Sequence, residues 1–328
     1  MRRLVLHGVG DLRVEEAPLP VPGPGEVRLS VSAVGVCGSD VHGYRGANTR
    51  RRPGTVMGHE VSGIVDAVGP GTDAGLVGAA VAVNPVVGCE HCADCAAGRP
   101  QRCATKELIG CVPSRPGGFA DAVVVPAGSV YRLRGGVDVR FGAFAEPLAT
   151  GVHAVAGRVG SGLRVLVIGS GAVGLSASWA AAADGADVCV LDRDGHRAPL
   201  AEELGVRPVA RAEAMAVAAD LVVDCVASDE SLDLAVAAGR VGGTIVVVGL
   251  GAPWAQVCVE RLVQDERSLV GSAQYTPRDF AAAVDAISTG RFSAAAVLRE
   301  PEELWSAPAI FRRWGDVDDP PLRVLLAP

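Results

Sequence analysis

The chain has 328 residues, of which 49% are hydrophobic and 20% are charged, so it is long enough for about two domains and too apolar to be intrinsically disordered. Its 37 acidic and 30 basic residues give a formal charge of -7, and such a mildly acidic surface argues against a nucleic-acid-binding protein. The sequence shows no secretory signal and no apolar run of about 18 residues, so we expect a cytoplasmic protein without a membrane partner.

The first 150 residues are rich in glycine and proline and contain short apolar runs bounded by turn residues. This pattern is typical of an irregular all-β domain. The turn-rich segment 19–25 is a connector rather than an element. The expected strands are Val27–Val34, Val61–Val68, Val77–Val83 and Ala122–Val125.

From about residue 160 the pattern alternates between buried strands and helices, which predicts a doubly wound parallel sheet. The sequence therefore predicts an α/β protein in which a β-rich domain precedes a parallel-sheet domain. The expected strands are Leu163–Ile168, Ala186–Leu191, Leu221–Cys225 and Thr244–Val248. The expected helices are Ala172–Ala183, Glu230–Ala238 and Pro277–Ser288, and a last apolar run covers Leu322–Leu326.

Four cysteines are closely spaced in a polar loop, at Cys89, Cys92, Cys95 and Cys103. Four thiolates at this spacing can surround one tetrahedral zinc ion and leave no open position, which is typical of a structural zinc site. The alternatives are two disulfides or four unrelated buried thiols. Because thiols stay reduced in the cytoplasm, clustered cysteines there favour a metal.

A second candidate metal site is dispersed along the first domain. Cys37 lies in a Gly-Val-Cys-Gly-Ser-Asp segment, His59 and Glu60 follow Gly58, and Glu146 precedes a proline. A thiolate, an imidazole and a carboxylate form a three-ligand set that leaves a fourth position open for substrate. Each residue alone has an ordinary alternative, because single cysteines are often buried apolar groups and single glutamates are often solvated.

The strand expected at 163–168 is followed by the segment Gly169-Ser170-Gly171-Ala172-Val173-Gly174, which opens the expected helix. Glycines at these positions allow a tight turn, close approach of a pyrophosphate and close helix–strand packing, and the helix N-terminus offers free N–H groups to phosphates. The alternative is a glycine-rich turn without a ligand. The flanking strand and helix favour dinucleotide binding.

Asp192 ends the second strand of this domain, 18 residues after Gly174. A carboxylate at this position accepts hydrogen bonds from the ribose 2'-hydroxyl and repels a 2'-phosphate, which favours NAD over NADP. Arg193 and Arg197 leave NADP open, because either guanidinium could bind a 2'-phosphate.

These three motifs, in this order, resemble the zinc-dependent medium-chain dehydrogenase/reductase family, and most closely its sorbitol (L-iditol) and L-idonate dehydrogenase-like polyol branch. The resemblance implies a GroES-like catalytic domain over 1–150 and 275–328, with a structural zinc lobe at about 88–104. It implies a Rossmann NAD-binding domain over 151–274. Two zinc ions per chain, one catalytic and one structural, are implied as well.

When the roles of the family's residues are transferred to the matching positions of this sequence, the resemblance implies that Cys37, His59 and either Glu60 or Glu146 bind the catalytic zinc. It implies that Ser39 and His42 form a proton relay and that the four clustered cysteines hold the structural zinc. We also assign Arg193 to the cofactor site, together with Val226, Gly249 and Leu250. The implied reaction is hydride transfer between NAD and a secondary alcohol such as a polyol, sugar acid or cyclitol, giving a ketone.

The resemblance further implies a homodimer or homotetramer, and we expect the stretch Gln256–Val263 to form the strand edge at which Rossmann domains pair. The segment between Gly205 and Leu221 is shorter than in the family, so the third βα unit is expected to be trimmed. The basic run Arg50-Arg51-Arg52, with Arg45 nearby, is expected either to be a solvated loop or to anchor an anionic substrate.

Two other functions remain possible at this point. A zinc-free NADPH-dependent quinone or enoyl reductase of the same fold would lack the Cys37, His59 and Glu146 set. A non-catalytic zinc protein that senses the NAD(H) ratio would need no relay of Ser39 and His42.

Overall fold

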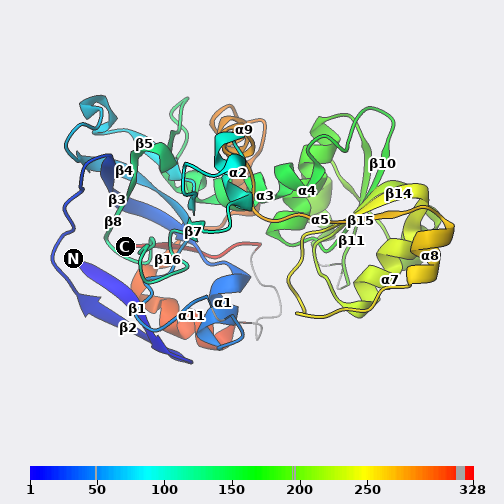
Figure 1. The fold of residues 1–328 in the computed structure, drawn as a ribbon, viewed down its shortest axis with the longest axis horizontal. Helices are drawn as coiled ribbons and strands as arrows, with labels where there is room; N and C mark the ends of the chain where they lie inside the picture. The colour runs from blue at the N-terminus through cyan, green and yellow to red at the C-terminus, as the bar shows by residue number, and fades with distance from the viewer. Residues whose placement is uncertain (49, 194, 196, 315–321) are drawn as a thin grey trace. The chain divides into compact units, whose positions relative to one another are not determined.

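The computed structural model describes residues 1–48, 50–193, 195, 197–314 and 322–328, and in Figure 1 the chain is drawn from blue at the N-terminus to red at the C-terminus. These residues form two compact units. The first unit contains Met1–Glu146 and Thr276–Pro328, and the second contains Pro147–Tyr275. Both ends of the chain therefore contribute to the first unit.

The first unit is built on a mostly antiparallel sheet in the strand order β16-β17-β3-β4-β5-β9, and β8 pairs with β3 beside this path. Along β3, Leu29 and Val31 are buried while the intervening Ser30 is exposed, because successive side chains of a strand point to opposite faces. The strands of this sheet are β3 (Glu26–Gly35), β4 (Glu60–Val68), β5 (Ala80–Val83), β8 (Ala122–Pro126), β9 (Val130–Arg132), β16 (Glu302–Glu303) and β17 (Leu325–Ala327).

Two small two-stranded ribbons and several short helices complete the first unit. The ribbons are β1 (Arg2–Gly8) with β2 (Asp11–Glu16), and β6 (Val86–Val87) with β7 (Glu107–Leu108). The helices are α1 (Gly38–Tyr44), α2 (Ala93–Ala96), α9 (Pro277–Ser288), α10 (Ala294–Val297) and α11 (Ala307–Arg313), and α3 (Ala145–Val155) begins in this unit. Single 3-10 turns lie at Ala74–Leu76, Pro100–Arg102, Ala127–Ser129 and Leu304–Ser306, and a longer one at Val139–Phe144.

The second unit contains a six-stranded parallel sheet in the order β12-β11-β10-β13-β14-β15. Its strands are β10 (Arg164–Ile168), β11 (Asp187–Leu191), β12 (Arg207–Pro208), β13 (Ala219–Asp224), β14 (Gly239–Val247) and β15 (Ser268–Gly271). The helices between them are α4 (Ala172–Ala183), α5 (Ala198–Glu203), α6 (Arg211–Ala216), α7 (Asp229–Ala238) and α8 (Val259–Gln264).

The parallel sheet changes winding direction at β10, because the chain runs outward first to β11 and β12 and later to β13, β14 and β15. Right-handed crossovers then place α4 and α7 on opposite faces of the sheet (Figure 1). Ligands of such sheets bind at the carboxyl ends of the strands beside this switch point, which here follows Ile168.

Two expected strands differ in the structure. The stretch Gln256–Val263 is not a strand, because Val259–Gln264 forms α8, and the strand at that edge of the sheet is β15. Leu262 packs against the core of the second unit while Val259 and Val263 are exposed, a helical rather than an alternating pattern. The run 77–83 is a strand only from Ala80, because its first residues follow a 3-10 turn.

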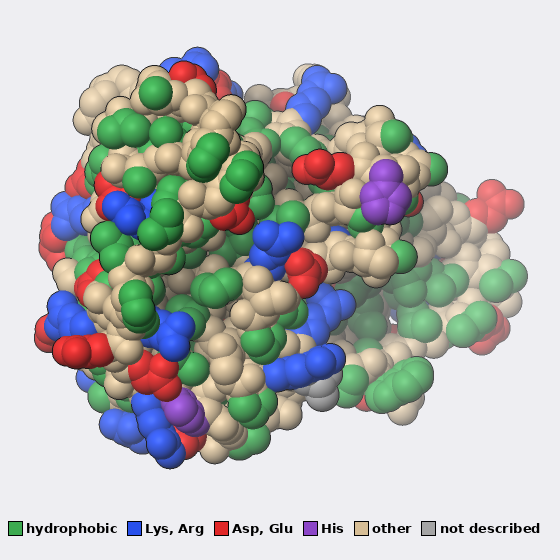
Figure 2. Space-filling view, turned by 60° about the vertical axis from the view of Figure 1, so that its left-hand side comes forward, with side chains coloured by type: hydrophobic (Ala, Val, Ile, Leu, Met, Phe, Trp, Pro, Cys, Tyr) green, Lys and Arg blue, Asp and Glu red, His purple; other side chains and the backbone are tan. Residues whose placement is uncertain are grey.

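On the face seen in Figure 2, Lys and Arg side chains are interspersed with Asp and Glu. None of the helices among the described residues is both long enough and apolar enough to span a bilayer.

Candidate active site

The end of β3 and the start of β4 bring three potential metal ligands together. These strands are antiparallel and pair Gly35 with Glu60, so Cys37, which follows β3, lies close to His59, which precedes β4. The Glu60 carboxylate occupies the space in which a side chain of Gly35 would lie. The register of one strand pair thus places a thiol, an imidazole and a carboxylate at the same sheet end.

Ligand atoms of Cys37, His59 and Glu60 all lie within 4.8 Å of one another. Glu60 is fully buried, and neither of its carboxylate oxygens receives a hydrogen bond from the described residues. Arg323 Nε lies 3.1 Å from Glu60 Oε2 and forms an ion pair without hydrogen-bond geometry. Buried carboxylate oxygens without donors, next to a thiol and an imidazole, fit a bound cation, and this donor set suits zinc with an open position.

The electrostatics of this cluster favour a thiolate at Cys37. Burial would raise the pKa of the Cys37 thiol, but its hydrogen bond with His59 and the positive charge of Arg323 lower that pKa to about 5. Burial raises the pKa of Glu60, and the charges of Cys37 and Glu146 raise it further. Since a thiolate is the form that binds metal, Cys37 is suited to be a ligand.

Glu146 lies at the start of α3, outside the group of three ligand atoms. Its negative charge contributes to the raised pKa values of Glu60 and Arg323, so it belongs to the surroundings of the site. Of the two carboxylates proposed from the sequence, Glu60 is the one that the structure gathers with Cys37 and His59.

Ser39 and His42 lie three residues apart on α1. Residues at this spacing share one face of a helix. Ser39 is partly buried and the side chain of His42 is exposed. The pair therefore runs from the buried metal-ligand cluster toward solvent.

Three charged residues lie around this cluster; Asp40 and Arg323 were not assigned to the site from the sequence, and Arg51 was expected in a solvated loop or as an anchor for an anionic substrate. Asp40 is fully buried, and its Oδ1 lies 3.4 Å from Nδ1 of His59. Arg51 forms an ion pair with Asp40 at 2.7 Å, and Arg323 pairs with Glu60. Asp40 could have been suspected from its position in the Cys37 segment, but no local pattern marks Arg323, which is far from Glu60 in sequence.

The structure changes the interpretation of the basic run 50–52. Arg50 and Arg52 are exposed, but Arg51 is buried and paired. Arg45 is exposed and donates to the backbone oxygen of Trp314 at 2.7 Å. The run is therefore not a single solvated cluster.

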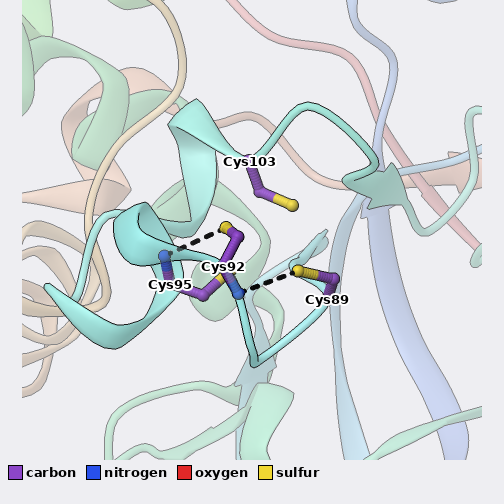
Figure 3. Close-up of side chains that lie close together, drawn as sticks. All are labelled: Cys89, Cys92, Cys95 and Cys103. Atoms are coloured by element: carbon purple, nitrogen blue, oxygen red, sulfur yellow. Dashed lines mark hydrogen bonds between the residues drawn. The ribbon is translucent and has the colours of Figure 1, made fainter.

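The four closely spaced cysteines converge, as Figure 3 shows, with their sulfur atoms all within 4.8 Å of one another. The backbone N–H of Cys92 donates to Cys89 Sγ, and that of Cys95 donates to Cys92 Sγ, each at 3.4 Å. All four are free thiols, and Cys103 is buried. Sulfurs that converge and accept backbone N–H bonds fit a closed tetrathiolate zinc site.

The glycine motif of the second unit follows β10 and opens α4. Gly169 has φ +93°, a backbone conformation that favours glycine, and a side chain on Gly174 would overlap the carbonyl oxygen of Gly169. Gly171 precedes α4 as its N-cap without a side-chain cap and has open space where a Cβ would lie. The first turn of α4, with Ala172 and Val173, therefore offers backbone N–H groups to a phosphate.

Asp192 follows β11 and is held against the glycine motif. Its Oδ2 accepts hydrogen bonds from the backbone N–H of Ser170 at 2.6 Å and from Ser170 Oγ at 2.5 Å. Arg193, next in sequence, is exposed. The structure thus places the carboxylate next to the glycine turn, where a dinucleotide's ribose is expected.

Val226, Gly249 and Leu250 follow β13 and β14 at the same end of the sheet. A side chain on Gly249 would overlap the backbone of Val226, so these two loops touch. Asp224 Oδ1 accepts hydrogen bonds from the backbone N–H groups of Val226 and Ala227, at 2.9 and 3.0 Å, and fixes the first loop. Leu250 is exposed.

Two family models match the chain. The model described as alcohol dehydrogenase GroES-like domain matches residues 23–135, and the model described as zinc-binding dehydrogenase matches residues 172–289. L-idonate 5-dehydrogenase of Vitis vinifera is 33% identical over 290 residues, which cover 82% of this chain and 79% of that protein.

Solved structures extend the similarity over the full length. A structure described as short chain alcohol dehydrogenase RspB of Escherichia coli CFT073, complexed with NADH, has a TM-score of 0.91 and 28% identity, covering 100% of this chain and 99% of that one. A zinc-binding dehydrogenase described as putative, from Sinorhizobium meliloti 1021 and bound to NADP, gives the same TM-score of 0.91, the same 28% identity and the same coverage of 100% and 99%.

Proposed function

Because the chain belongs to the zinc-dependent medium-chain dehydrogenase/reductase family, with relatives among the polyol and sugar-acid dehydrogenases, we propose that it oxidises a secondary alcohol to a ketone with NAD. The alcohol is a polyol, a sugar acid or a cyclitol-like compound. The proposal includes a catalytic zinc, a structural zinc, and a homodimer or homotetramer in the cytoplasm.

One observation carries this proposal. Cys37, His59 and Glu60 gather in the first unit, and the buried Glu60 carboxylate has no hydrogen-bond donor. A closed structural site would use a fourth protein ligand, whereas three ligands leave room for substrate. Ser39, which lies two residues after Cys37 on α1, adds the hydroxyl that an alcohol-oxidising site needs.

The residues of the first unit have separate roles in the proposed reaction. When bound, zinc would supply Lewis acidity toward the substrate oxygen, and nicotinamide would supply the hydride acceptor. Cys37 and His59, with Glu60, hold the metal in a fixed place, and the Asp40 carboxylate at His59 Nδ1 fixes the imidazole orientation. Ser39 Oγ would accept the proton that the alcohol loses while passing on its own hydroxyl proton, and His42, at the end of the relay, would release one proton to solvent.

The preference for NAD rests on Asp192. Its carboxylate, held by Ser170, accepts hydrogen bonds from ribose hydroxyls and repels a 2'-phosphate. NADP is the second candidate cofactor, because Arg193 is exposed next to Asp192 and a solved relative binds NADP.

A zinc-free reductase is disfavoured by the gathered ligand set, and a non-catalytic NAD(H) sensor is disfavoured by the Ser39 and His42 pair.

A kinetic panel tests the proposal. Purified protein of known zinc content is assayed with NAD and with NADP against neutral polyols and their anionic analogues, namely the corresponding sugar acids and sugar phosphates. We expect NAD-dependent formation of ketone with at least one secondary polyol or sugar acid. Zinc-replete protein that binds NADH but oxidises none of these alcohols would be a sensor, and activity that survives complete zinc removal would identify a zinc-free reductase.

A further inference from the structure

Arg51 is the one residue of the run 50–52 whose side chain is inside the protein, with 3% of it exposed. Its Nε and Nη2 atoms both donate to Oδ1 of Asp40, at 3.0 and 2.7 Å. Nη2 also donates to Ser39 Oγ at 3.0 Å. One guanidinium group therefore contacts the carboxylate beside His59 and the hydroxyl of the proposed relay.

We infer that Arg51 is a positioning residue of the catalytic site, which fixes both the Asp40 carboxylate that orients His59 and the Ser39 hydroxyl. This inference rests on the proposed function, because it concerns the same metal and relay site. It assigns Arg51 neither to a solvated loop nor to the binding of an anionic substrate.

Asp40 links Arg51 to the ligand set. Its Oδ1 faces His59 Nδ1 at 3.4 Å, and its Oδ2 accepts the backbone N–H of Cys37 at 3.3 Å. A histidine that binds metal through one ring nitrogen usually donates its other N–H to such a carboxylate, which sets the ring orientation. Arg51 holds Asp40 with two N–H bonds, and its Nη2 also lies 3.4 Å from His59 Nδ1. It therefore restricts the position of Cys37 through Asp40, and that of His59 both through Asp40 and by direct contact.

The bond to Ser39 acts on the relay directly. A serine hydroxyl has one proton to donate and two lone pairs. Since Arg51 occupies one lone pair of Ser39 Oγ, the other lone pair and the proton remain for the two partners of a relay. Arg51 thus limits the orientations in which Ser39 can accept one proton and donate another.

The neighbouring helix leaves room for this side chain. A Cβ on Gly43 of α1 would lie 2.8 Å from Cβ and 3.0 Å from Cγ of Arg51, and closer still to Cδ. These atoms belong to the base of the side chain, which cannot move away without displacing the guanidinium. Gly43 therefore permits the buried position of Arg51, and substitution there perturbs Arg51 without removing its charge.

Substitution of Arg51 tests the inference, with Arg52 as the matched control because it is the exposed neighbour. We compare Arg51→Met, Arg51→Lys and Arg52→Met after replacement of zinc by Co²⁺. Absorption of Co²⁺ reports the geometry of its ligands without any substrate, and the tetrathiolate site serves as an internal reference. We expect the bands of the three-ligand site to shift in Arg51→Met and to remain unchanged in Arg52→Met.

Activity provides the second readout. We expect Arg51→Met to lower kcat about 10–100-fold, the usual effect of losing a group that orients a metal ligand, with KM for the cofactor changed less than twofold. Arg51→Lys should restore part of this loss and part of the spectrum, because an ammonium keeps the charge but cannot reproduce the planar fork. A purely structural arginine would not give this graded rescue in a folded protein.

A double-substitution cycle covers the case in which Arg51→Met fails to fold because Asp40 is left unpaired. Gly43→Ala keeps every charge and should shift the Co²⁺ bands and lower kcat in the wild-type background. In the Arg51→Lys background it should add little, because the two substitutions disturb the same contact. Full additivity of the two effects would count against the inference.

The inference is overturned if folded Arg51→Met or Gly43→Ala matches Arg52→Met in Co²⁺ absorption and in kcat. The proposed function fails separately, if wild-type protein with two zinc ions oxidises no alcohol. In that event the Co²⁺ comparison still decides whether Arg51 orients the metal ligands.

Discussion

Gly35, the last residue of β3, lies opposite Glu60, the first residue of β4, and the carboxylate of Glu60 fills the space where a Gly35 side chain would be. The missing side chain is thus what allows a carboxylate to be buried beside Cys37. Gly35→Ala should destabilise the fold by about 1–3 kcal/mol, the usual cost of overpacking, and should reduce zinc at the three-ligand site. Denaturant unfolding and metal analysis measure both effects.

Gly128→Ala is the control for Gly35→Ala, because Gly128 is exposed in the same unit and has open space where the new methyl group would lie. We expect it to change neither stability nor zinc content. Equal behaviour of the two variants would show that Glu60 does not need the space beside Gly35.

The two cysteine sites should respond differently to substitution. Wild-type protein should contain about two zinc ions per chain by mass spectrometry of metal content. Cys92→Ser should lose one zinc and unfold at a lower temperature, because binding free energy at a structural site contributes to folding. Cys37→Ser should abolish activity while the thermal midpoint changes less. A wild-type zinc content near one ion per chain would show that one of the two proposed zinc sites does not exist.

Asp192 should decide between the two dinucleotides. Asp192→Ala removes the ribose hydrogen bonds and the charge that repels a 2'-phosphate. The ratio of kcat/KM for NAD to that for NADP should then move toward NADP by roughly 1–3 kcal/mol, or about 5- to 150-fold. Ser170→Ala should move it in the same direction by less, because the backbone N–H of Ser170 still holds the carboxylate. A wild-type preference for NADP would instead assign the pocket to Arg193 or Arg197.

The exposed His42 should act as a base at the end of the relay. His42→Ala should keep both zinc ions and lower the rate of alcohol oxidation by about 100-fold or less near neutral pH. The deficit should shrink as the pH rises, since hydroxide then takes the proton. His7→Ala, in the first unit on β1, serves as the control. A loss that is constant across the pH range, mainly in KM for the cofactor, would mean that His42 only packs at the site.

Assembly should depend on the outer edge of the parallel sheet. β15 is an edge strand, and Leu269 on it is exposed, as are Val263 on α8 and Trp254. An apolar edge of this kind favours pairing with a second copy. Light scattering at micromolar concentration should give the mass of a dimer or tetramer. Leu269→Glu should weaken this association, whereas Val9→Glu in the first unit should leave it unchanged. A wild-type monomer would contradict the proposed oligomer.

The sequence by itself determined those features that depend on local spacing. The cysteines at 89, 92, 95 and 103 had to lie within one short loop, and the glycines at 169, 171 and 174 define a strand–turn–helix wherever the domain folds. The alternation of apolar runs after residue 160 likewise predicted the parallel sheet, and the family resemblance predicted Cys37 and His59 as ligands of one metal. Local hydrogen bonding and side-chain periodicity are enough to specify such features.

Tertiary structure alone decided what depends on register and burial. The pairing of Gly35 with Glu60 placed Glu60, rather than Glu146, among the gathered ligands. The space at Gly43 allowed Arg51 to be buried against Asp40, although its neighbours in the same basic run face solvent. Residues Val259–Gln264 form a helix with Leu262 packed against the core, within the stretch Gln256–Val263 that was expected to be an edge strand. Each outcome depends on contacts between residues distant in sequence or on which side of an element is buried, and local patterns do not contain that information.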